Sequence, residues 1–107
     1  MKVSISTQEN LKTFQGTNSK GQNITLGNGT AVSPMESVLM AAASCSTIDI
    51  VMILEKMRQD IKDIKVEVEG TRRDEIPKIF TKIHMHYILT GDIKESKAQQ
   101  ALSLIHI

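Results

Sequence analysis

The longest apolar run in the chain, residues 38–54, limits the folds that are available to the whole sequence. Ser33 precedes this run, Pro34 follows the serine at once, and Glu36 stands three residues after it. A serine with a glutamate three residues later forms a capping box, and proline is favoured at the first position of a helix. The pattern predicts a helix from Ser33 to Arg58 that is apolar on almost every side and therefore buried in a core.

Alternation of apolar and polar residues predicts strands on both sides of this helix. Residues 3–26 contain three short candidate strands with glycine-rich turns, which indicates an N-terminal antiparallel meander. Residues 64–69 and 79–89 are expected to pair as a β-hairpin, and a second helix is expected from Asp92 onward. The fold class is therefore α+β, with a meander, a long buried central helix, a hairpin and a second helix.

The length of the chain, 107 residues, corresponds to one domain at most, spanning residues 1–107. The second predicted helix runs into residues 103–107 without a cap, a glycine or a polar tail. We therefore expect the natural protein to continue beyond Ala101 and this domain to be truncated at its C-terminus.

The charge and the cysteine content of the chain limit the partners and the compartment that can be expected for it. The net charge is +1 with acids and bases interleaved, so neither a nucleic acid nor an anionic membrane is an expected partner. The apolar run is shorter than the roughly 20 residues of a membrane span and contains Asp49. One cysteine excludes an internal disulfide and a cysteine-based zinc site, and it suits a reducing compartment. A cytoplasmic location is expected.

Cys45, the only thiol, lies about twelve residues into the predicted helix, beyond the first turn where the helix dipole favours a thiolate. Asp49 stands one turn later on the same face, and an anion there does not favour a thiolate. Glu36 stands nine residues earlier, roughly half a turn away around the helix, and is better explained as a cap. On the residues alone, Cys45 is interpreted as a small buried hydrophobic residue.

Two other groups of polar residues are candidate sites. His84 and His86 share one strand face, but no acid or cysteine has an evident spacing to complete a metal site, so a polar sheet face is the interpretation. The charged residues 72–75 are interpreted as a solvated loop, with the alternative that they supply a cation to an active site across a dimer.

Three features together resemble the OsmC/Ohr family of osmotically inducible and organic-hydroperoxide-resistance proteins. They are the sequence Ser33-Pro34-Met35-Glu36, the alanine-rich run into Cys45, and the strand from Ile79-Phe80 to Tyr87 ending at Gly91. The resemblance extends to about Ala101. It implies an α+β homodimer whose two long helices lie between sheets, with active sites at the subunit interface.

The resemblance also implies a thiol peroxidase. In the family one cysteine attacks the hydroperoxide and becomes a sulfenic acid, which a second cysteine in the C-terminal region resolves. Cys45 matches the peroxidatic position, and this chain holds no second cysteine. The family's reductases have a glutamate directly after the proline and an arginine in the meander; here Met35 follows Pro34, Glu36 comes next, and the meander cations are lysines.

These points give one main expectation and one alternative. We expect a cytoplasmic homodimer that reduces organic hydroperoxides, with Cys45 and Glu36 as catalytic residues and an external dithiol as reductant. No metal and no organic cofactor are expected. The alternative is a non-catalytic dimeric module that binds a small ligand, with Cys45 as core packing.

Overall fold

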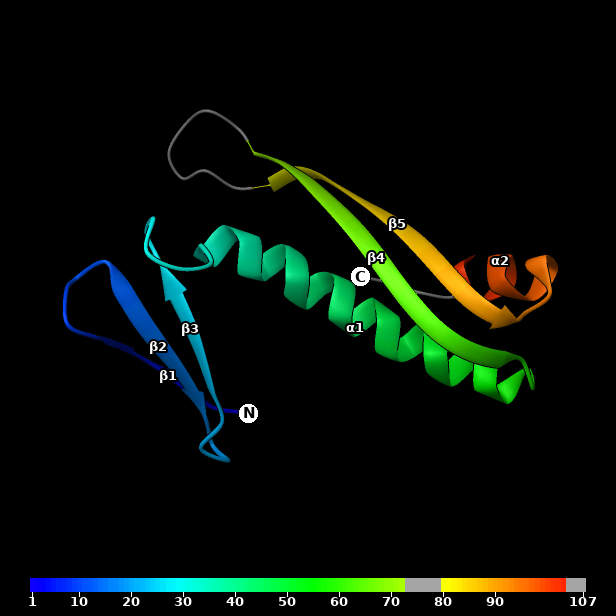
Figure 1. Ribbon diagram of the computed structural model, residues 1–107, viewed down its shortest axis with the longest axis horizontal. Coiled ribbons are helices and arrows are strands. Elements are labelled where there is room, and N and C mark those ends of the chain that lie inside the picture. The colour runs from blue at the N-terminus through cyan, green and yellow to red at the C-terminus, as the bar shows by residue number, and fades with distance from the viewer. Residues whose placement is uncertain (73–79, 104–107) are drawn as a thin grey trace. The chain divides into compact units, whose positions relative to one another are not determined.

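The computed structural model describes residues 1–72 and 80–103, which fall into a first unit, Met1–Val38, and a second unit that begins at Leu39. The single domain spanning residues 1–107 stays a prediction. The predicted α+β class is confirmed, and Figure 1 shows the elements in chain order. They are β1 (Val3–Thr7), β2 (Thr13–Asn18), β3 (Asn23–Gly27), α1 (Pro34–Lys56), β4 (Asp60–Arg72), β5 (Phe80–Asp92) and α2 (Glu95–Ser103).

The first unit contains the predicted meander, a three-stranded antiparallel sheet in the order β1-β2-β3. Ile5 pairs with Gly16, and Gly16 pairs in turn with Ile24. The turn between β2 and β3 is closed by the Asn18 side chain, whose oxygen accepts the backbone amides of Lys20 at 3.0 Å and Gln22 at 2.9 Å. Asparagine suits this position because its short side chain satisfies backbone donors in a turn.

The predicted capping box at the start of α1 is confirmed. The Glu36 amide donates to the Ser33 hydroxyl at 3.1 Å, and the Ser33 amide donates to the Glu36 carboxylate at 3.0 Å. Two of the amide groups that a helix N-terminus leaves without partners are thereby satisfied.

The end of α1 was not predicted in detail, because no glycine marks it. Arg58 takes the left-handed conformation with a φ of 57°. Its amide donates to Glu55 O at 2.9 Å, and the Gln59 amide donates to Leu54 O at 3.0 Å. These two bonds form a Schellman motif, with arginine at the position that glycine usually takes.

The second unit combines the body of α1 with the hairpin β4–β5 and with α2 (Figure 1). The two strands pair antiparallel from Asp60 opposite Asp92 to Arg72 opposite Phe80, so both are longer than predicted. The second helix begins at Glu95 rather than Asp92, which belongs to β5. Of the charged residues 72–75, those from 73 onward lie outside the described residues.

The core of the second unit is small and aliphatic. Ile50 and Leu54 from α1 and Ala101 from α2 are fully buried at its centre. Partly buried side chains from all the neighbouring elements surround them: Ile53, Met57, Ile61, Ile64, Tyr87, Leu89 and Ile93.

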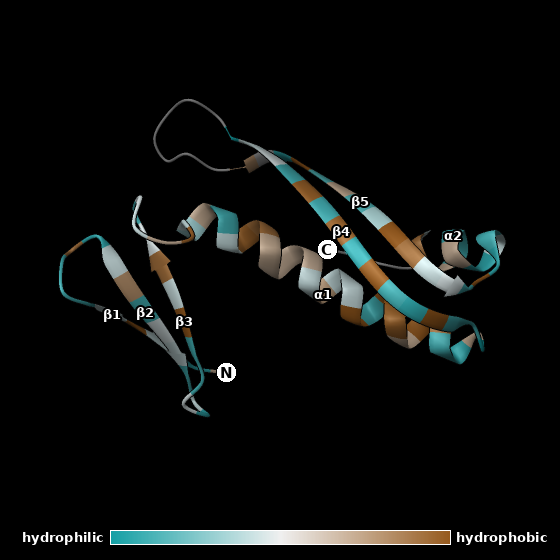
Figure 2. Cartoon of the chain, in the orientation of Figure 1, coloured by the Kyte–Doolittle hydropathy of each residue, from teal (hydrophilic) through white to brown (hydrophobic). Residues whose placement is uncertain are grey.

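The prediction that α1 is buried on almost every side is wrong for this chain. Only Ala43, Ser46, Ile50 and Leu54 of the helix are buried, and they share one face. A two-stranded hairpin has one apolar face and covers one side of a helix, so the opposite side stays open. Figure 2 shows apolar residues along much of α1. Apolar side chains are therefore not confined to the buried face of the helix.

The helix α1 itself has 23 residues and is long and apolar enough to cross a membrane, by length and composition only. The expectation from the sequence counted only the apolar run, residues 38–54. The whole helix is longer, so its length does not exclude a membrane span. Core helices of soluble proteins meet the same criterion, so membrane association does not follow from it.

Candidate active site

Cys45 lies on the side of α1 that the hairpin leaves uncovered, and it is exposed. Four other exposed residues share that side at helical spacing, and we call the five together the open face of α1. The open face consists of Ala41, Cys45, Ile48, Asp49 and Met52. The interpretation of Cys45 as core packing is therefore wrong within this chain, where the thiol is accessible.

The surroundings of Cys45 are mostly apolar. Ile48 is 60% exposed and Met52 is 53% exposed, values that are high for large apolar side chains on one helix face. Asp49 is the charged member of the open face, and it too is exposed, so water can solvate its carboxylate. An accessible thiol next to apolar surface can receive a molecule that has an apolar body and a reactive polar group.

Glu36, the second predicted site residue, is engaged elsewhere. Hydrogen bonds from the backbone and from the side chain of Ser33 hold the pKa of the Glu36 carboxyl below its ordinary value of 4.5. The structure therefore places Glu36 in the helix cap.

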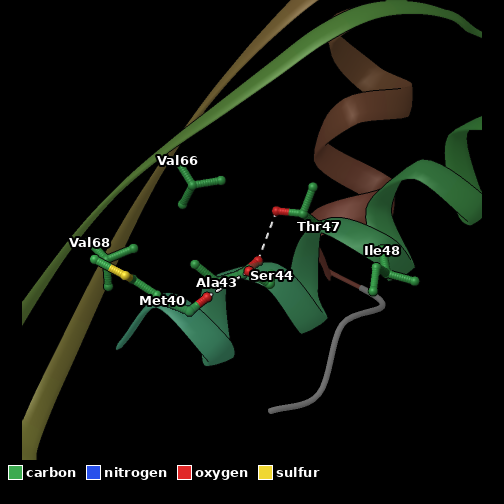
Figure 3. Close-up of a pocket in the computed structure, with 7 residues that line it drawn as sticks. All are labelled: Met40, Ala43, Ser44, Thr47, Ile48, Val66 and Val68. Atoms are coloured by element: carbon green, nitrogen blue, oxygen red, sulfur yellow. Dashed lines mark hydrogen bonds between the residues drawn. The ribbon is translucent and has the colours of Figure 1, made fainter. Parts of the chain in front are cut away.

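A groove between α1 and β4, with a volume of about 490 Å³, was not predicted (Figure 3). Its lining is apolar apart from two hydroxyl groups, those of Ser44 and Thr47, and both donate to helix carbonyls at 2.8 Å. The groove therefore presents apolar surface with few free polar groups. It is lined by Met40, Ala43, Ser44, Thr47, Ile48, Val66 and Val68.

A small polar cluster joins α1 to β5 inside the second unit. The buried Ser46 hydroxyl donates to Ala42 O at 3.0 Å and lies 4.0 Å from the sulfur of Met85, and the Tyr87 hydroxyl lies 3.5 Å from the same sulfur. A thioether is a weak acceptor, and here it accepts the Tyr87 hydroxyl, whereas the single proton of the Ser46 hydroxyl goes to Ala42 O. Sequence patterns could not have predicted it, because 39 residues separate Ser46 from Met85.

Among residues 1–72 and 80–103, as the side chains stand, no group of three or more histidine, cysteine, aspartate or glutamate residues could hold a metal ion. His84 and His86 are exposed, as expected for a polar sheet face. The geometry thus defines a small α+β protein with an accessible thiol on an apolar side of its longest helix.

Comparison with known proteins assigns the chain to a family. The model of the OsmC-like protein family matches residues 27–106, so the chain belongs to the OsmC-like family. A curated relative, Protein YhfA of Escherichia coli strain K12, is 45% identical over 96 residues, which cover 86% of this chain and 72% of the relative. The resemblance found from the sequence is confirmed.

Solved structures agree with this assignment. A hypothetical protein from Aquifex aeolicus VF5 is 37% identical, with a TM-score of 0.86 over 96% of this chain and 76% of that protein. An OsmC-like protein from Mycoplasma pneumoniae has a TM-score of 0.81 at 15% identity, over 95% of this chain and 77% of that protein, and supports the fold alone.

Proposed function

We propose that the protein is an OsmC-like thiol peroxidase that reduces organic hydroperoxides with Cys45 as the nucleophile. The observation that carries the proposal is the exposure of Cys45 on the apolar open face of α1. The apolar neighbours Ile48 and Met52 can contact the organic part of a hydroperoxide while the thiolate reaches the peroxide oxygen.

The proposed reaction has two stages. The Cys45 thiolate attacks one oxygen of ROOH, the O–O bond breaks, and ROH leaves after taking up a proton, so that the sulfur becomes a sulfenic acid. An external dithiol then attacks the sulfenic sulfur and releases water, and its second thiol displaces Cys45 as a thiol. The dithiol supplies both electrons and becomes a disulfide. It must come from outside, because this chain has one cysteine.

A homodimer in the cytoplasm is part of this proposal. The open face of α1 exposes large apolar side chains on the element that also supplies the thiol, and such patches mark association surfaces. A second copy that covers part of the open face would exclude water around Cys45. The cytoplasm is proposed because it keeps a lone exposed thiol reduced.

The test is chemical trapping of the oxidised sulfur. After one equivalent of an organic hydroperoxide, we expect dimedone to add a single label at Cys45, and Cys45→Ser to abolish both the label and hydroperoxide consumption. Ser44→Cys in the Cys45→Ser background provides a matched control, since it places an exposed thiol one residue away. Equal reactivity of the two thiols would show that the position of Cys45 has no special role.

The role of Glu36 in catalysis stays a prediction, and the cap makes it testable. Ser33→Ala and Glu36→Gln both weaken the capping box, but only the second removes a carboxylate. If Glu36 assists the thiol, Glu36→Gln slows sulfenic acid formation far more than Ser33→Ala does. Equal effects would assign Glu36 to helix capping alone.

The groove between α1 and β4 favours a second candidate, a module that binds a small apolar ligand. Cys45 does not line the groove, so this function predicts that Cys45→Ser leaves binding unchanged. Fluorescence of an apolar dye would report occupancy, with Val66→Asp as the variant that blocks the groove. Dye binding that is insensitive to Val66→Asp would exclude the groove as the site.

A further inference from the structure

The outer face of the β4–β5 hairpin places two histidines opposite two glutamates. In the register of the strands, Glu67 pairs with His86 and Glu69 pairs with His84. All four side chains are exposed. Neighbouring residues of β5, such as Met85, face α1, and alternation along a strand therefore turns the histidines outward.

We propose that this outer face binds one transition-metal ion of the Zn²⁺ or Ni²⁺ class through His84, His86 and Glu69. The sequence shows no acid at a spacing that indicates a metal site, because Glu67 and Glu69 lie some fifteen to nineteen residues away from their partner histidines along the chain. The antiparallel register brings them directly opposite the histidines. The proposal does not depend on the chemistry of Cys45.

The spacing on the sheet allows the three side chains to meet. Directly opposed Cβ atoms are about 5 Å apart, and residues two apart on one strand are about 7 Å apart. Imidazole and carboxylate arms are long enough to bring ligand atoms to the roughly 2.1 Å that zinc requires. As the side chains stand, no group of three among the described residues could hold a metal ion, so binding requires the exposed side chains of His84, His86 and Glu69 to change rotamer.

The charges around the site select Glu69 over Glu67 as the carboxylate ligand. The Lys65 ammonium already pairs with Glu67 at 3.6 Å, whereas no comparable ion pair to Glu69 is found within the described parts of the chain. Two imidazoles and one carboxylate suit Zn²⁺, Ni²⁺ and Cu²⁺, and they disfavour Mg²⁺ and Ca²⁺, which prefer oxygen ligands. Water would complete the coordination.

The test is a titration of the full chain with Zn²⁺ by calorimetry, in the Cys45→Ser background so that the thiol cannot bind the metal. We expect one ion per chain, and a loss of at least about tenfold in affinity on substituting His84→Ala or His86→Ala. Glu69→Gln should weaken binding, while Lys65→Ala, which removes a neighbouring cation, should not.

The histidine resonances provide the second measurement. We expect Ni²⁺ to broaden the ring signals of His84 and His86 at substoichiometric concentrations. Absence of Zn²⁺ binding, binding that survives the His84→Ala/His86→Ala double substitution, or ring signals of His84 and His86 that Ni²⁺ leaves sharp would overturn the proposal.

Discussion

The backbone amide of Lys94 donates a 2.8 Å hydrogen bond to the side-chain oxygen of Gln59, across 35 residues of sequence. The side-chain amide of Gln59 in turn donates to Met57 O at 3.0 Å. One side chain therefore connects the end of α1 to the residue before α2, and it uses both its donor and its acceptor.

We expect Gln59→Ala to lower the free energy of unfolding by about 1–2 kcal/mol, because it leaves one backbone donor and one acceptor without these partners. Urea unfolding followed by circular dichroism measures the change. Gln99→Ala, at an exposed position of α2, is the matched control and should stay within about 0.5 kcal/mol of the parent. Equal losses for both variants would mean that the Gln59 bridge adds nothing to stability.

The left-handed Arg58 offers a gain in stability. A residue with a side chain pays about 1 kcal/mol for this conformation, whereas glycine adopts it without a steric penalty. Arg58→Gly should therefore stabilise the protein by up to about 1 kcal/mol, although part of the gain is lost to the greater freedom of the unfolded chain. Arg58→Ala separates backbone conformation from charge and should leave stability near that of the parent. A destabilised Arg58→Gly protein would contradict the Schellman geometry.

Gly91 has the opposite sensitivity. It pairs with Ile61 at an irregularity of the β4–β5 ladder and has a φ of 142°. A Cβ atom there would lie against the Asp60 carbonyl oxygen and 2.8 Å from the Lys62 nitrogen. We expect Gly91→Ala to cost about 2 kcal/mol or more in thermal or urea unfolding.

Gly21→Ala is the control for Gly91→Ala, because Gly21 also has positive φ, 79°, but has open space around it. Only the conformational penalty, about 1 kcal/mol, applies there. A Gly91→Ala protein as stable as the Gly21→Ala protein would show that β4 can shift away from the new methyl group.

The capping box and the strands were predictable because the forces that form them act over a few residues. Ser33 and Glu36 are three residues apart, and the alternation that marks β4 is contained within Ile64–Glu69. The Schellman motif at Arg58 is equally local, but arginine carries no signal for a left-handed residue.

The burial of each face of α1 could not be predicted, because it depends on which elements pack against that face. The apolar residues that contact the hairpin, such as Ile50, and those that stay exposed, such as Ile48, are the same residue type on one helix. Only the placement of β4 and β5 distinguishes them. For the same reason Cys45 was interpreted as core packing, and the cross-strand pairing of Glu69 with His84 was not foreseen.

The open face of α1 provides a direct test of the proposed homodimer. Ile48→Glu and Met52→Glu each place a charge on this face, and burying an unpaired charge between two copies is costly. We expect either variant to shift sedimentation from dimer toward monomer. Ile88→Glu, on the outer face of the hairpin and 39% exposed, should leave the dimer intact. A parent protein that sediments as a monomer would refute the dimer itself.

The pH dependence of the helix cap follows from Glu36. Its pKa is lower in the folded protein than its ordinary value of 4.5, because the backbone and side chain of Ser33 donate hydrogen bonds to the charged carboxylate. A group with a depressed folded pKa contributes stability above its unfolded pKa and loses it as the pH falls through the folded one. The cap is therefore expected to be fully formed above pH 4.5 and to weaken progressively below it.

Carbon-13 NMR of the Glu36 carboxyl measures this titration. Ser33→Ala removes the hydroxyl donor and keeps the backbone donor, so it should raise the pKa of Glu36 only part of the way toward 4.5. Glu36→Gln should remove this contribution to the acid-dependent loss of stability, since its amide cannot be protonated in that range. If Glu36 titrates at its ordinary value in the parent protein, the capping box does not form in solution, and the start of α1 must be stabilised in another way.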